Sequence, residues 1–246
     1  MSKNTNDLKN DSPLSDIQIG EVTAQWAKSI NLKTNYYKSI DSTNLQAKKQ
    51  AFEQEELENE VVVYFTDDQT AGRGRFDHTW STPAFGTSLL STWSFAISQA
   101  PSPQTTLKVG LALYNSICAT WGLNFSLKAP NDLFLGEKKV AGILVETVTQ
   151  GFEHRLLIGL GLNVLSHPKE ILTATSLISN FPKNMPLLGD DWISFVDRFL
   201  YELTLLIPTI SDDLTSTQQL NIIKILNQNP KLEKPYTSFN EVLKII

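Results

Sequence analysis

A loop that runs from Gln69 to Trp80 separates two stretches with the composition of buried strands. Val61 to Phe65 is β-branched and aromatic, and Thr87 to Phe95 is similarly strand-like. A tight hairpin would be enough to join such strands, yet this loop alternates two glycines with two arginines. Glycine lets backbone amides turn toward an anion, and arginine supplies planar, permanently charged donors. The loop is therefore a candidate anion-binding segment, and a solvated basic turn is the alternative that these residues leave equally open.

The overall charge limits which partners the chain can have. With 246 residues, 41% of them hydrophobic, the chain can bury the core of one large domain or of one domain with a small appendage. A net charge of −5 disfavours general binding to nucleic acid or to a membrane surface. Cys118 is the single cysteine, and neither a membrane span nor a secretory signal is present in the sequence. We expect a cytoplasmic protein, and a monomer and a homodimer remain equally open.

The first part of the chain is predicted to be an appendage. A polar tail extends to about Ser12, and apolar residues near helical spacing between Ser15 and Ile30 predict one amphipathic helix. A winged-helix DNA-binding domain would need roughly twice the available residues. Residues 1–33 are therefore expected to form a tail and a helix, residues 34–210 the main domain, and residues 211–246 a C-terminal appendage.

Helical periodicity is clear at two further places. Between Thr105 and Trp121 an apolar stripe predicts a helix with one buried face, and Cys118 on that stripe is expected to be a small buried side chain rather than a nucleophile. Asp190 to Leu206 reads as a second amphipathic helix. The tail from Gln218 to Ile246 predicts more helix and loop, interrupted by Asn-Pro and Lys-Pro.

A polar cluster marks a predicted helix start after a short strand from Tyr36 to Ile40. Asp41, Ser42, Thr43 and Asn44 precede a run rich in Leu, Ala, Lys and Gln, which is a helix N-terminus signal. One hydroxyl would be enough for a cap, so the cluster leaves room for a polar ligand pocket. From these residues alone the cap is the favoured interpretation.

Charged and amide side chains gather again around a predicted hairpin. Lys128, Asn131 and Asp132 lie beside Pro130, which interrupts strand pairing, and a turn is predicted at Gly136 before Lys139. Strand ends hold such side chains rigidly while leaving them accessible. Solvated lysines and an ordinary Asn-Asp turn are the alternatives for each residue taken singly.

Glycines interrupt the apolar run from Leu156 to Val164. Gly159 and Gly161 invite a dinucleotide-binding interpretation, but the third glycine of that motif is absent and His167-Pro168 soon follows. Glycines inside a strand more often mark a close backbone approach, which makes Asn163 at the strand end a candidate ligand contact. The three histidines are too widely spread to predict a metal cluster.

Five motifs in this order resemble the biotin protein ligases. They are Asp-Ser-Thr-Asn at 41–44, Gln-x-Ala-Gly-Arg-Gly-Arg with Trp at 69–80, Lys-x-Pro-Asn-Asp-Leu at 128–133, Lys-Val-Ala-Gly-Ile-Leu-Val-Glu at 139–146 and Gly-x-Gly-x-Asn at 159–163. The resemblance implies an α+β fold with a mixed β-sheet backed by helices, related to class II aminoacyl-tRNA synthetases. It also implies activation of biotin by ATP to biotinyl-5′-adenylate, with Mg²⁺, and transfer of biotin to a lysine of a biotin carboxyl carrier protein.

The resemblance also implies roles for individual residues. The residues implied to bind biotin are Ser42, Thr43, Asn44, Gln69, Arg73, Gly74, Arg75, Trp80 and Lys139. Those implied to contact the nucleotide are Arg75, Lys128, Asn131, Asp132 and Asn163, with Arg75, Lys139 and Asp132 as the catalytic set. Asp132 is hypothesised to orient the attacking amine or the metal, and holding Lys128 is the structural alternative. The loop is expected to order over biotin as a lid.

Two departures from the family pattern bear on these expectations. Many bacterial members continue the loop with Arg-Arg-Gly-Arg, whereas Phe76, Asp77 and His78 follow Arg75 here. The family usually ends in a small SH3-like β-domain, which the helical pattern of the C-terminal tail predicts to be absent or replaced. A non-catalytic biotin-binding or carrier-binding module is therefore the alternative to an active ligase, and a lipoate or octanoyl ligase is a more remote one.

Overall fold

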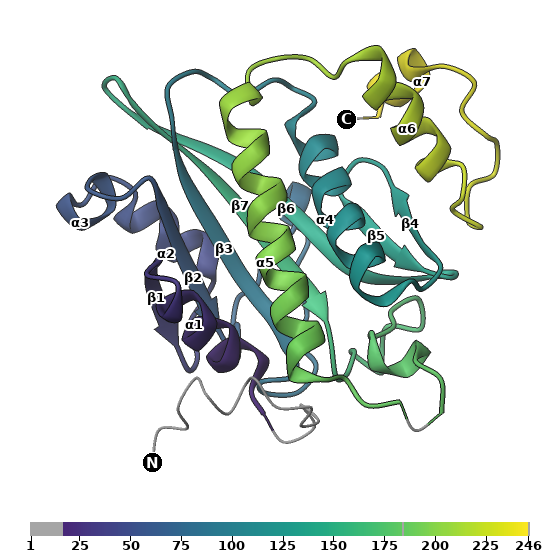
Figure 1. Ribbon diagram of the computed structural model, residues 1–246, viewed down its shortest axis with the longest axis horizontal. Coiled ribbons are helices and arrows are strands. Elements are labelled where there is room, and N and C mark those ends of the chain that lie inside the picture. The colour runs from purple at the N-terminus through teal and green to yellow at the C-terminus, as the bar shows by residue number, and fades with distance from the viewer. Residues whose placement is uncertain (1–16, 184, 246) are drawn as a thin grey trace.

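The fold is built on one mixed β-sheet, seen in the computed structural model, which describes residues 17–183 and 185–245 (Figure 1). Seven strands lie in the order β1-β2-β3-β7-β6-β5-β4. β1 and β2 are parallel and all other neighbours are antiparallel. The strands are β1 (Lys33–Tyr37), β2 (Val61–Thr66), β3 (Ser88–Ile97), β4 (Phe125–Lys128), β5 (Asp132–Leu135), β6 (Lys138–Gln150) and β7 (Glu153–Asn163).

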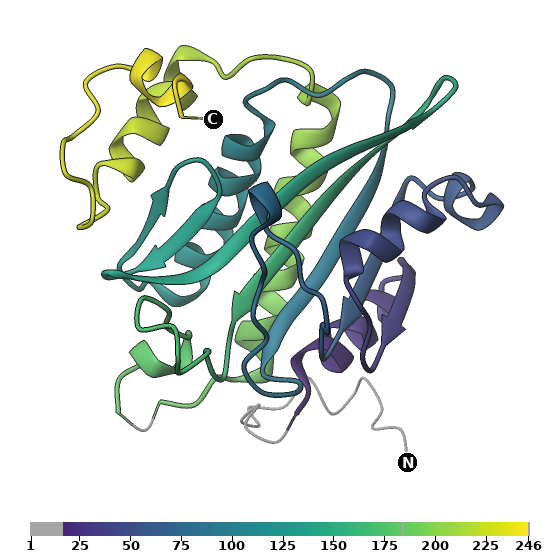
Figure 2. The same cartoon turned by 180° about the vertical axis from the view of Figure 1, so that it is seen from behind.

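Helices cover the two faces of this sheet unequally. The α-helices are α1 (Ile19–Ser29), α2 (Thr43–Gln50), α3 (Gln54–Leu57), α4 (Thr105–Trp121), α5 (Gly189–Leu206), α6 (Ser216–Leu226) and α7 (Phe239–Leu243). α1, α4 and α5 lie on one face, whereas α2 and the β2–β3 connection lie on the other (Figures 1 and 2). The predicted mixed sheet backed by helices is confirmed. None of the helices in the described part of the chain combines the length and apolar character needed to cross a bilayer.

Strand β7 shows how the sequence separates the two faces. Side chains of a strand alternate between faces, so every second residue points the same way. Leu156, Ile158, Leu160 and Leu162 are buried in the core beneath α4 and α5. The intervening residues, Leu157, Gly159, Gly161 and Asn163, face the α2 side. This second face therefore carries few bulky side chains along the middle of the strand.

Helix α1 packs into the main core, which differs from the appendage expected for residues 1–33. Its Trp26 lies 6.1 Å from Trp93 of β3, centroid to centroid, and donates a 2.7 Å hydrogen bond to Asp197 of α5. Asp67, at the end of β2, accepts the Gly20 amide of the first helical turn at 3.0 Å. Apolar burial and these polar contacts fix the helix to the sheet. The predicted polar tail lies outside the described residues.

The first strand begins earlier than expected and ends at Tyr37. The strand predicted from Tyr36 to Ile40 therefore lies three residues earlier in the chain, at Lys33–Tyr37. Ile40 instead forms an isolated bridge with Gln69, and its amide donates to Asp68 at 3.1 Å. This pairing draws the start of α2 against the beginning of the loop from Gln69 to Trp80.

The C-terminal segment is helical and shares the same core. Ile222 and Leu226 of α6 and Val242 of α7 are almost fully buried. Described residues 207–245 contain no strand, in agreement with the helix-and-loop expectation for the tail. Because α6 packs beside the edge strand β4, this segment covers an edge of the sheet rather than standing apart from it.

A buried polar cluster joins α3 to the sheet. Arg155 of β7 is 2% exposed and donates to the Ser94 hydroxyl at 2.8 Å and to the Glu56 carbonyl at 2.8 Å. Glu56 is also 2% exposed and accepts a hydrogen bond from Tyr64, while its second carboxylate oxygen has no partner among the described residues. Burial raises the pKa of the Glu56 carboxyl above its ordinary value. Ionisation of Glu56 therefore lowers the stability of the folded state.

This cost predicts a pH-dependent effect of Glu56→Gln. Because burial raises the folded-state pKa of Glu56, folding is favoured when Glu56 is protonated, and this contribution is lost as pH rises from about 4 toward neutrality. The free energy of unfolding of the variant minus that of the wild type should therefore increase over this range, as measured by urea unfolding. Glu58→Gln removes an exposed charge nearby and serves as the control. A difference for Glu56→Gln that stays constant with pH would contradict this account.

Candidate functional site

A pocket of about 240 Å³ lies on the α2 face of the sheet. It is bounded by the start of α2, the loop from Gln69 to Trp80, the β4–β5 turn and the middle of β6 and β7. In Figure 2 the β2–β3 connection crosses in front of these strands. The pocket brings together most of the site residues expected from the sequence, namely Ser42, Thr43, Asn44, Gln69, Arg73, Gly74, Arg75, Trp80, Asn131, Asp132 and Lys139.

Glycines form the floor of the pocket. Gly142 of β6 pairs with Gly161 of β7, and Gly159 lies two residues before Gly161 on the same face. A Cβ on Gly161 would lie 2.5 Å from Cε2 of Trp80, and one on Gly159 would overlap Oδ1 of Asn44. The expectation that these strand glycines mark close approaches is confirmed. The missing side chains make room for an indole and an amide directly on the backbone.

Trp80 connects the loop to this floor. Its indole lies over Gly142 and Gly161, and the Lys139 ammonium nitrogen is 5.7 Å from its ring centroid. The indole nitrogen is buried and has no hydrogen-bond partner among the described residues. Because a buried donor without an acceptor is costly, this N–H is a candidate contact for a ligand acceptor. Trp80 thus supplies both an apolar wall and a potential donor.

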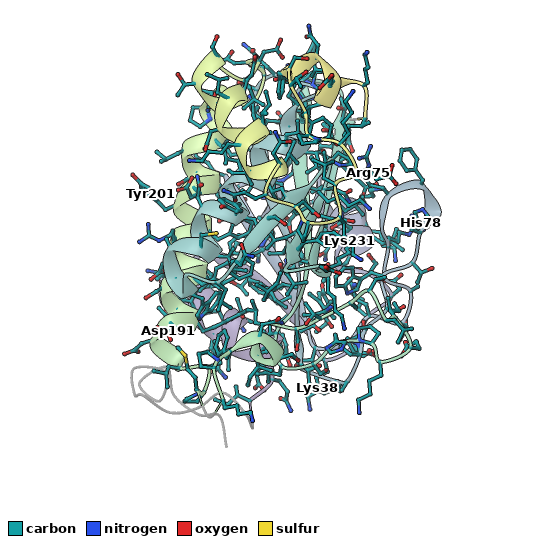
Figure 3. The ribbon with its side chains drawn as sticks, turned by 90° about the vertical axis from the view of Figure 1, so that its right-hand side faces the viewer. Lys38, Arg75, His78, Asp191, Tyr201 and Lys231 are labelled. Atoms are coloured by element: carbon teal, nitrogen blue, oxygen red, sulfur yellow. The ribbon has the colours of Figure 1, made fainter. Side chains whose placement is uncertain are left out.

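The loop itself is held by backbone hydrogen bonds. The Trp80 amide donates to the Gly72 carbonyl at 3.0 Å, and the Gly74 amide donates to the His78 carbonyl at 2.7 Å. At the tip, Phe76 has φ +50° and is 83% exposed, with the Arg75 guanidinium carbon 4.9 Å from its ring centroid. Arg75 and His78 project on the side of the sheet opposite α5, which carries Tyr201 (Figure 3). The glycine-arginine stretch therefore borders the pocket.

The helix start divides its polar residues between two tasks. Ser42 accepts the Leu45 amide and so caps α2, as the capping interpretation predicts. Thr43 instead donates its amide to Oε1 of Gln69 at 2.9 Å, and its hydroxyl lies 3.1 Å from the same oxygen. With its oxygen bonded to Thr43, Gln69 keeps its amide nitrogen for another partner. The cluster is both a cap and part of the pocket wall.

A half-buried ion pair stands at the far side of the pocket. Asp132 and Lys139 are joined by a 2.7 Å contact between Oδ1 and Nζ. Asp132 is the one carboxylate among the described lining residues. It pairs with Lys139, whereas the structural alternative expected it to hold Lys128. Asn131 exchanges hydrogen bonds with the backbone of Ile143, from its side chain and its carbonyl, both at 2.9 Å. These bonds fix the β4–β5 turn against β6.

Two expected site residues lie outside this pocket. Lys128 is exposed at the end of β4, with its ammonium nitrogen 5.8 Å from the Phe134 ring centroid, and it borders a separate cavity against the C-terminal segment. Asn163 is buried at the end of β7 and donates to the Thr175 carbonyl at 3.0 Å. Its side-chain oxygen has no partner among the described residues. Nucleotide contacts by these two residues stay a prediction.

Sequence reasoning missed a network beneath Asn44. The Asn44 side chain donates to Glu146 of β6 at 3.0 Å and accepts a hydrogen bond from Thr92 of β3, and Lys48 pairs with Glu146 at 2.6 Å. Glu146 ends the fourth sequence motif, and Thr92 is one of the hydroxyl residues of β3. Both residues are polar and lie on the strand face opposite the core, and this position was the sequence feature that could have indicated a role for them. Within the described part of the chain, no group of three or more His, Cys, Asp or Glu side chains could hold a metal ion.

Comparison with known proteins places this pocket in a family context. Residues 36–163, just over half of the chain, match the sequence model of the biotin/lipoate A/B protein ligase family. The chain belongs to this family. The matched range spans the sequence from β1 to the end of β7 and thus includes every expected site residue.

Individual family members are similar over different lengths. A biotin–[acetyl-CoA-carboxylase] ligase from Mycobacterium tuberculosis is 31% identical over 182 residues, which cover 71% of this chain and 59% of that protein. The bifunctional ligase/repressor BirA of Bacillus subtilis is 33% identical over 113 residues, 45% of this chain and 35% of that protein. The chain thus spans between about a third and three fifths of these curated relatives.

A solved structure in the family shares the fold. The biotin protein ligase from Aquifex aeolicus in complex with biotin and ATP superposes with a TM-score of 0.59 at 24% identity, covering 79% of this chain and 78% of that one. The fold expected from the resemblance, a mixed sheet backed by helices, is thereby confirmed.

The glycine floor predicts a clear stability difference between two substitutions. Gly159→Ala places a Cβ against the Asn44 side chain, so unfolding free energy should fall by about 1–3 kcal/mol, as for other overpacked sites. Gly110→Ala in α4 is the matched control, because its Cβ would meet only Leu127 methyl groups at 3.8 Å. The control should be neutral or stabilising by up to about 1 kcal/mol through helix propensity. Urea unfolding of both variants measures the difference, and equal stabilities would contradict the proposed close approach.

Proposed function

We propose that this chain is a biotin protein ligase that activates biotin with ATP to biotinyl-5′-adenylate and transfers it to a lysine of a biotin carboxyl carrier protein. The observation that carries the proposal is a compact pocket with an apolar wall at Trp80 and cationic groups at Arg75 and Lys139. The amide hydrogens of Gln69, which have no partner among the described residues, add donors. Such a pocket matches a small acid with an apolar body and a hydrogen-bonding ring. Family membership and the biotin ligases among its relatives support the same conclusion.

The first step requires two anions to meet. The biotin carboxylate must attack the α-phosphorus of ATP, and pyrophosphate leaves, so positive charge has to offset the repulsion between them. Arg75 borders the pocket, and Lys139 already carries a counter-ion in Asp132. A substrate carboxylate can take part of the interaction that Asp132 makes with Lys139. We infer that Lys139 and Arg75 hold the carboxylate and the α-phosphate together.

Biotin itself is recognised by fixed polar groups. Because Thr43 occupies the oxygen of Gln69, the Gln69 amide nitrogen is left to donate to a carbonyl such as that of the ureido ring. The unpaired indole nitrogen of Trp80 is a second donor bordering the pocket. At about 240 Å³, the pocket falls below the range of roughly 300–1,000 Å³ usual for ligand sites, so it is too small to hold biotin and ATP together. The nucleotide would occupy the adjoining surface toward Asn131 and Asn163.

Magnesium is expected to arrive with the nucleotide. Mg²⁺ usually keeps several waters and binds through substrate phosphates with one or two carboxylates, so no larger cluster of protein ligands is required. Asp132 is the carboxylate that the described lining residues offer to it. When bound, the ion would neutralise charge on the phosphates of ATP.

In the second step the amine of the carrier lysine attacks the acyl carbon of the adenylate, forming an amide and releasing AMP. The carrier lysine releases one proton to solvent before it attacks and a second as the amide forms. Asp132, which lines the pocket, is proposed to orient the amine. The acceptor would be the carrier subunit of a biotin-dependent carboxylase. A cytoplasmic location and a monomeric or homodimeric state, without nucleic-acid binding, complete the proposal.

The function is tested by incubating the purified chain with labelled biotin, MgATP and a carrier domain. A ligase produces labelled adenylate without the carrier and labelled carrier in its presence. Biotin binding without adenylate would instead identify a non-catalytic module. Preferential use of lipoate in parallel reactions would identify the other branch of the family.

Removal of Lys139 should impair the first step most. Lys139→Met removes one of the two cations proposed to hold the carboxylate and α-phosphate, and the rate of adenylate formation should fall by about 100-fold or more. Lys138→Met removes an exposed neighbouring charge and is the matched control, with a rate close to that of the wild type. Pyrophosphate exchange measures both rates. Equal rates for the two variants would refute the assigned role of Lys139.

A further inference from the structure

Glu146 is linked to the pocket through Asn44. It lies on β6 opposite Leu157 of β7, so its side chain points toward α2 on the pocket face. One carboxylate oxygen accepts a 3.0 Å hydrogen bond from Asn44, and the other contacts Lys48 at 2.6 Å. Asn44 is 4% exposed, so its hydrogen bonds are shielded from water. Glu146 ends the fourth sequence motif, and the contacts proposed above for biotin and ATP do not use it.

The carboxylate determines which way the Asn44 amide points. Ionised Glu146 can only accept hydrogen bonds, so Asn44 must turn its NH₂ group toward it. The Asn44 oxygen then faces the opposite side, where it accepts from Thr92 and lies directly on Gly159. An amide turned the other way would place its oxygen against a carboxylate and its NH₂ against the Thr92 hydroxyl. Glu146 thus selects one of two orientations.

This orientation affects the hydroxyl groups of Thr92 and Thr43. Thr92 has one hydroxyl proton, and donating it to Asn44 leaves its oxygen as an acceptor at 2.9 Å from the Thr43 hydroxyl. Thr43 also has one hydroxyl proton. When Thr43 donates that proton to Thr92, only its backbone amide donates to the Gln69 oxygen, at 2.9 Å. A reversed Asn44 would donate its NH₂ to the Thr92 hydroxyl, so Thr92 would donate to Thr43 and the Thr43 hydroxyl to Gln69. The orientation of Asn44 therefore sets the direction in which the hydroxyl protons of Thr92 and Thr43 point.

We propose that Glu146 is a positioning residue of the biotin site, which orients the Asn44 amide and, through Thr92, sets the direction in which the Thr43 hydroxyl donates. Asn44 and Thr43 both line the pocket. The proposal rests on the proposed biotin ligase function for the identity of the ligand. It assigns Glu146 an effect on biotin affinity rather than on the chemical step, because none of its contacts reaches the reacting atoms.

The competing explanation is a helix anchor. The pair between Lys48 and Glu146 could simply hold α2 on the sheet, and both side chains are about 30% exposed, so the pair alone contributes little. If anchoring is the role, Lys48→Met and Glu146→Ala should weaken biotin binding equally. If orientation is the role, Glu146→Ala should be the worse change, because Lys48→Met leaves the acceptor for Asn44 in place.

Calorimetric biotin binding and steady-state adenylate formation distinguish these explanations. Glu146→Ala should raise the Kd for biotin by about tenfold or more, with kcat at saturating biotin within about threefold of the wild type. Glu146→Gln keeps an acceptor oxygen and should stay within about threefold in Kd. Lys49→Met removes an exposed lysine of the same helix and is the control for helix charge. A Kd for Glu146→Ala within about twofold of the wild type, or equal losses for Lys48→Met, would overturn the proposal.

A paired exchange tests the hydrogen bond itself. Asn44→Asp places two carboxylates about 3 Å apart and should weaken biotin binding more than Glu146→Ala does. Adding Glu146→Gln supplies a donor to Asp and should recover about tenfold of that loss. Failure of the double variant to bind better than Asn44→Asp would contradict the positioning role.

A readout without ligand separates this proposal from the proposed function. In ¹⁵N spectra, Glu146→Ala should shift or broaden the side-chain NH₂ signals of Asn44, whereas Lys49→Met should leave these signals unchanged. Unchanged signals in folded Glu146→Ala would overturn the positioning role whether or not the wild type uses biotin. Absence of adenylate from the wild type, with the expected signal changes intact, would count against the ligase function alone.

Discussion

The close approach of side chains to the glycines of β6 and β7 is the constraint on which the rest of the site depends. On one face of β7, leucine and isoleucine build the core with α4 and α5, while the opposite face carries Gly159 and Gly161. The absence of Cβ atoms lowers the pocket floor to the backbone. Trp80 and Asn44 occupy that space, one from the loop and one from α2. The same alternation therefore stabilises the fold on one side and opens a pocket on the other.

Charge in the site is local and compensated. The chain carries a net charge of −5, yet the pocket borders two arginines and Lys139, with Asp132 as the described carboxylate among its walls. The Asp132–Lys139 pair is about a quarter to a third exposed, so its net contribution to stability is small. Its value is instead that Lys139 is held in place before an anionic substrate arrives. This arrangement suits a reaction in which a carboxylate and a phosphate must be brought together.

Much of the fold was predictable because local patterns and tertiary packing agree. The helix at 105–121 was predicted with the bounds observed, and the turn at Gly136 falls where its φ of +58° favours glycine. The loop, the helix start and the Asn-Asp turn each combine polar groups with a strand or helix end, which made them candidates for a site. The order of the five motifs, and not any one of these segments, assigned them to a common pocket. Those features can be read from neighbouring residues along the chain.

Other features depend on contacts between distant segments. Lys128 shares a motif with Asp132, but its position at the end of β4 directs it toward the C-terminal segment, and only the three-dimensional packing decides this. Helix α1 enters the core through Trp26 and the cap from Asp67, partners that lie far along the chain. Glu146 and Thr92 join Asn44 because β3, β6 and α2 meet on one face. The spacing of residues along the sequence does not indicate such long-range contacts.

A crystal structure of the chain with biotin tests the central claim most directly. The account predicts electron density for biotin on the α2 face, with its ring between Gln69 and Trp80 over the glycine floor and its carboxylate within hydrogen-bond distance of Lys139 or Arg75. Electron density for biotin elsewhere on the molecule, with no biotin in the pocket above Gly142, Gly159 and Gly161, would contradict the account.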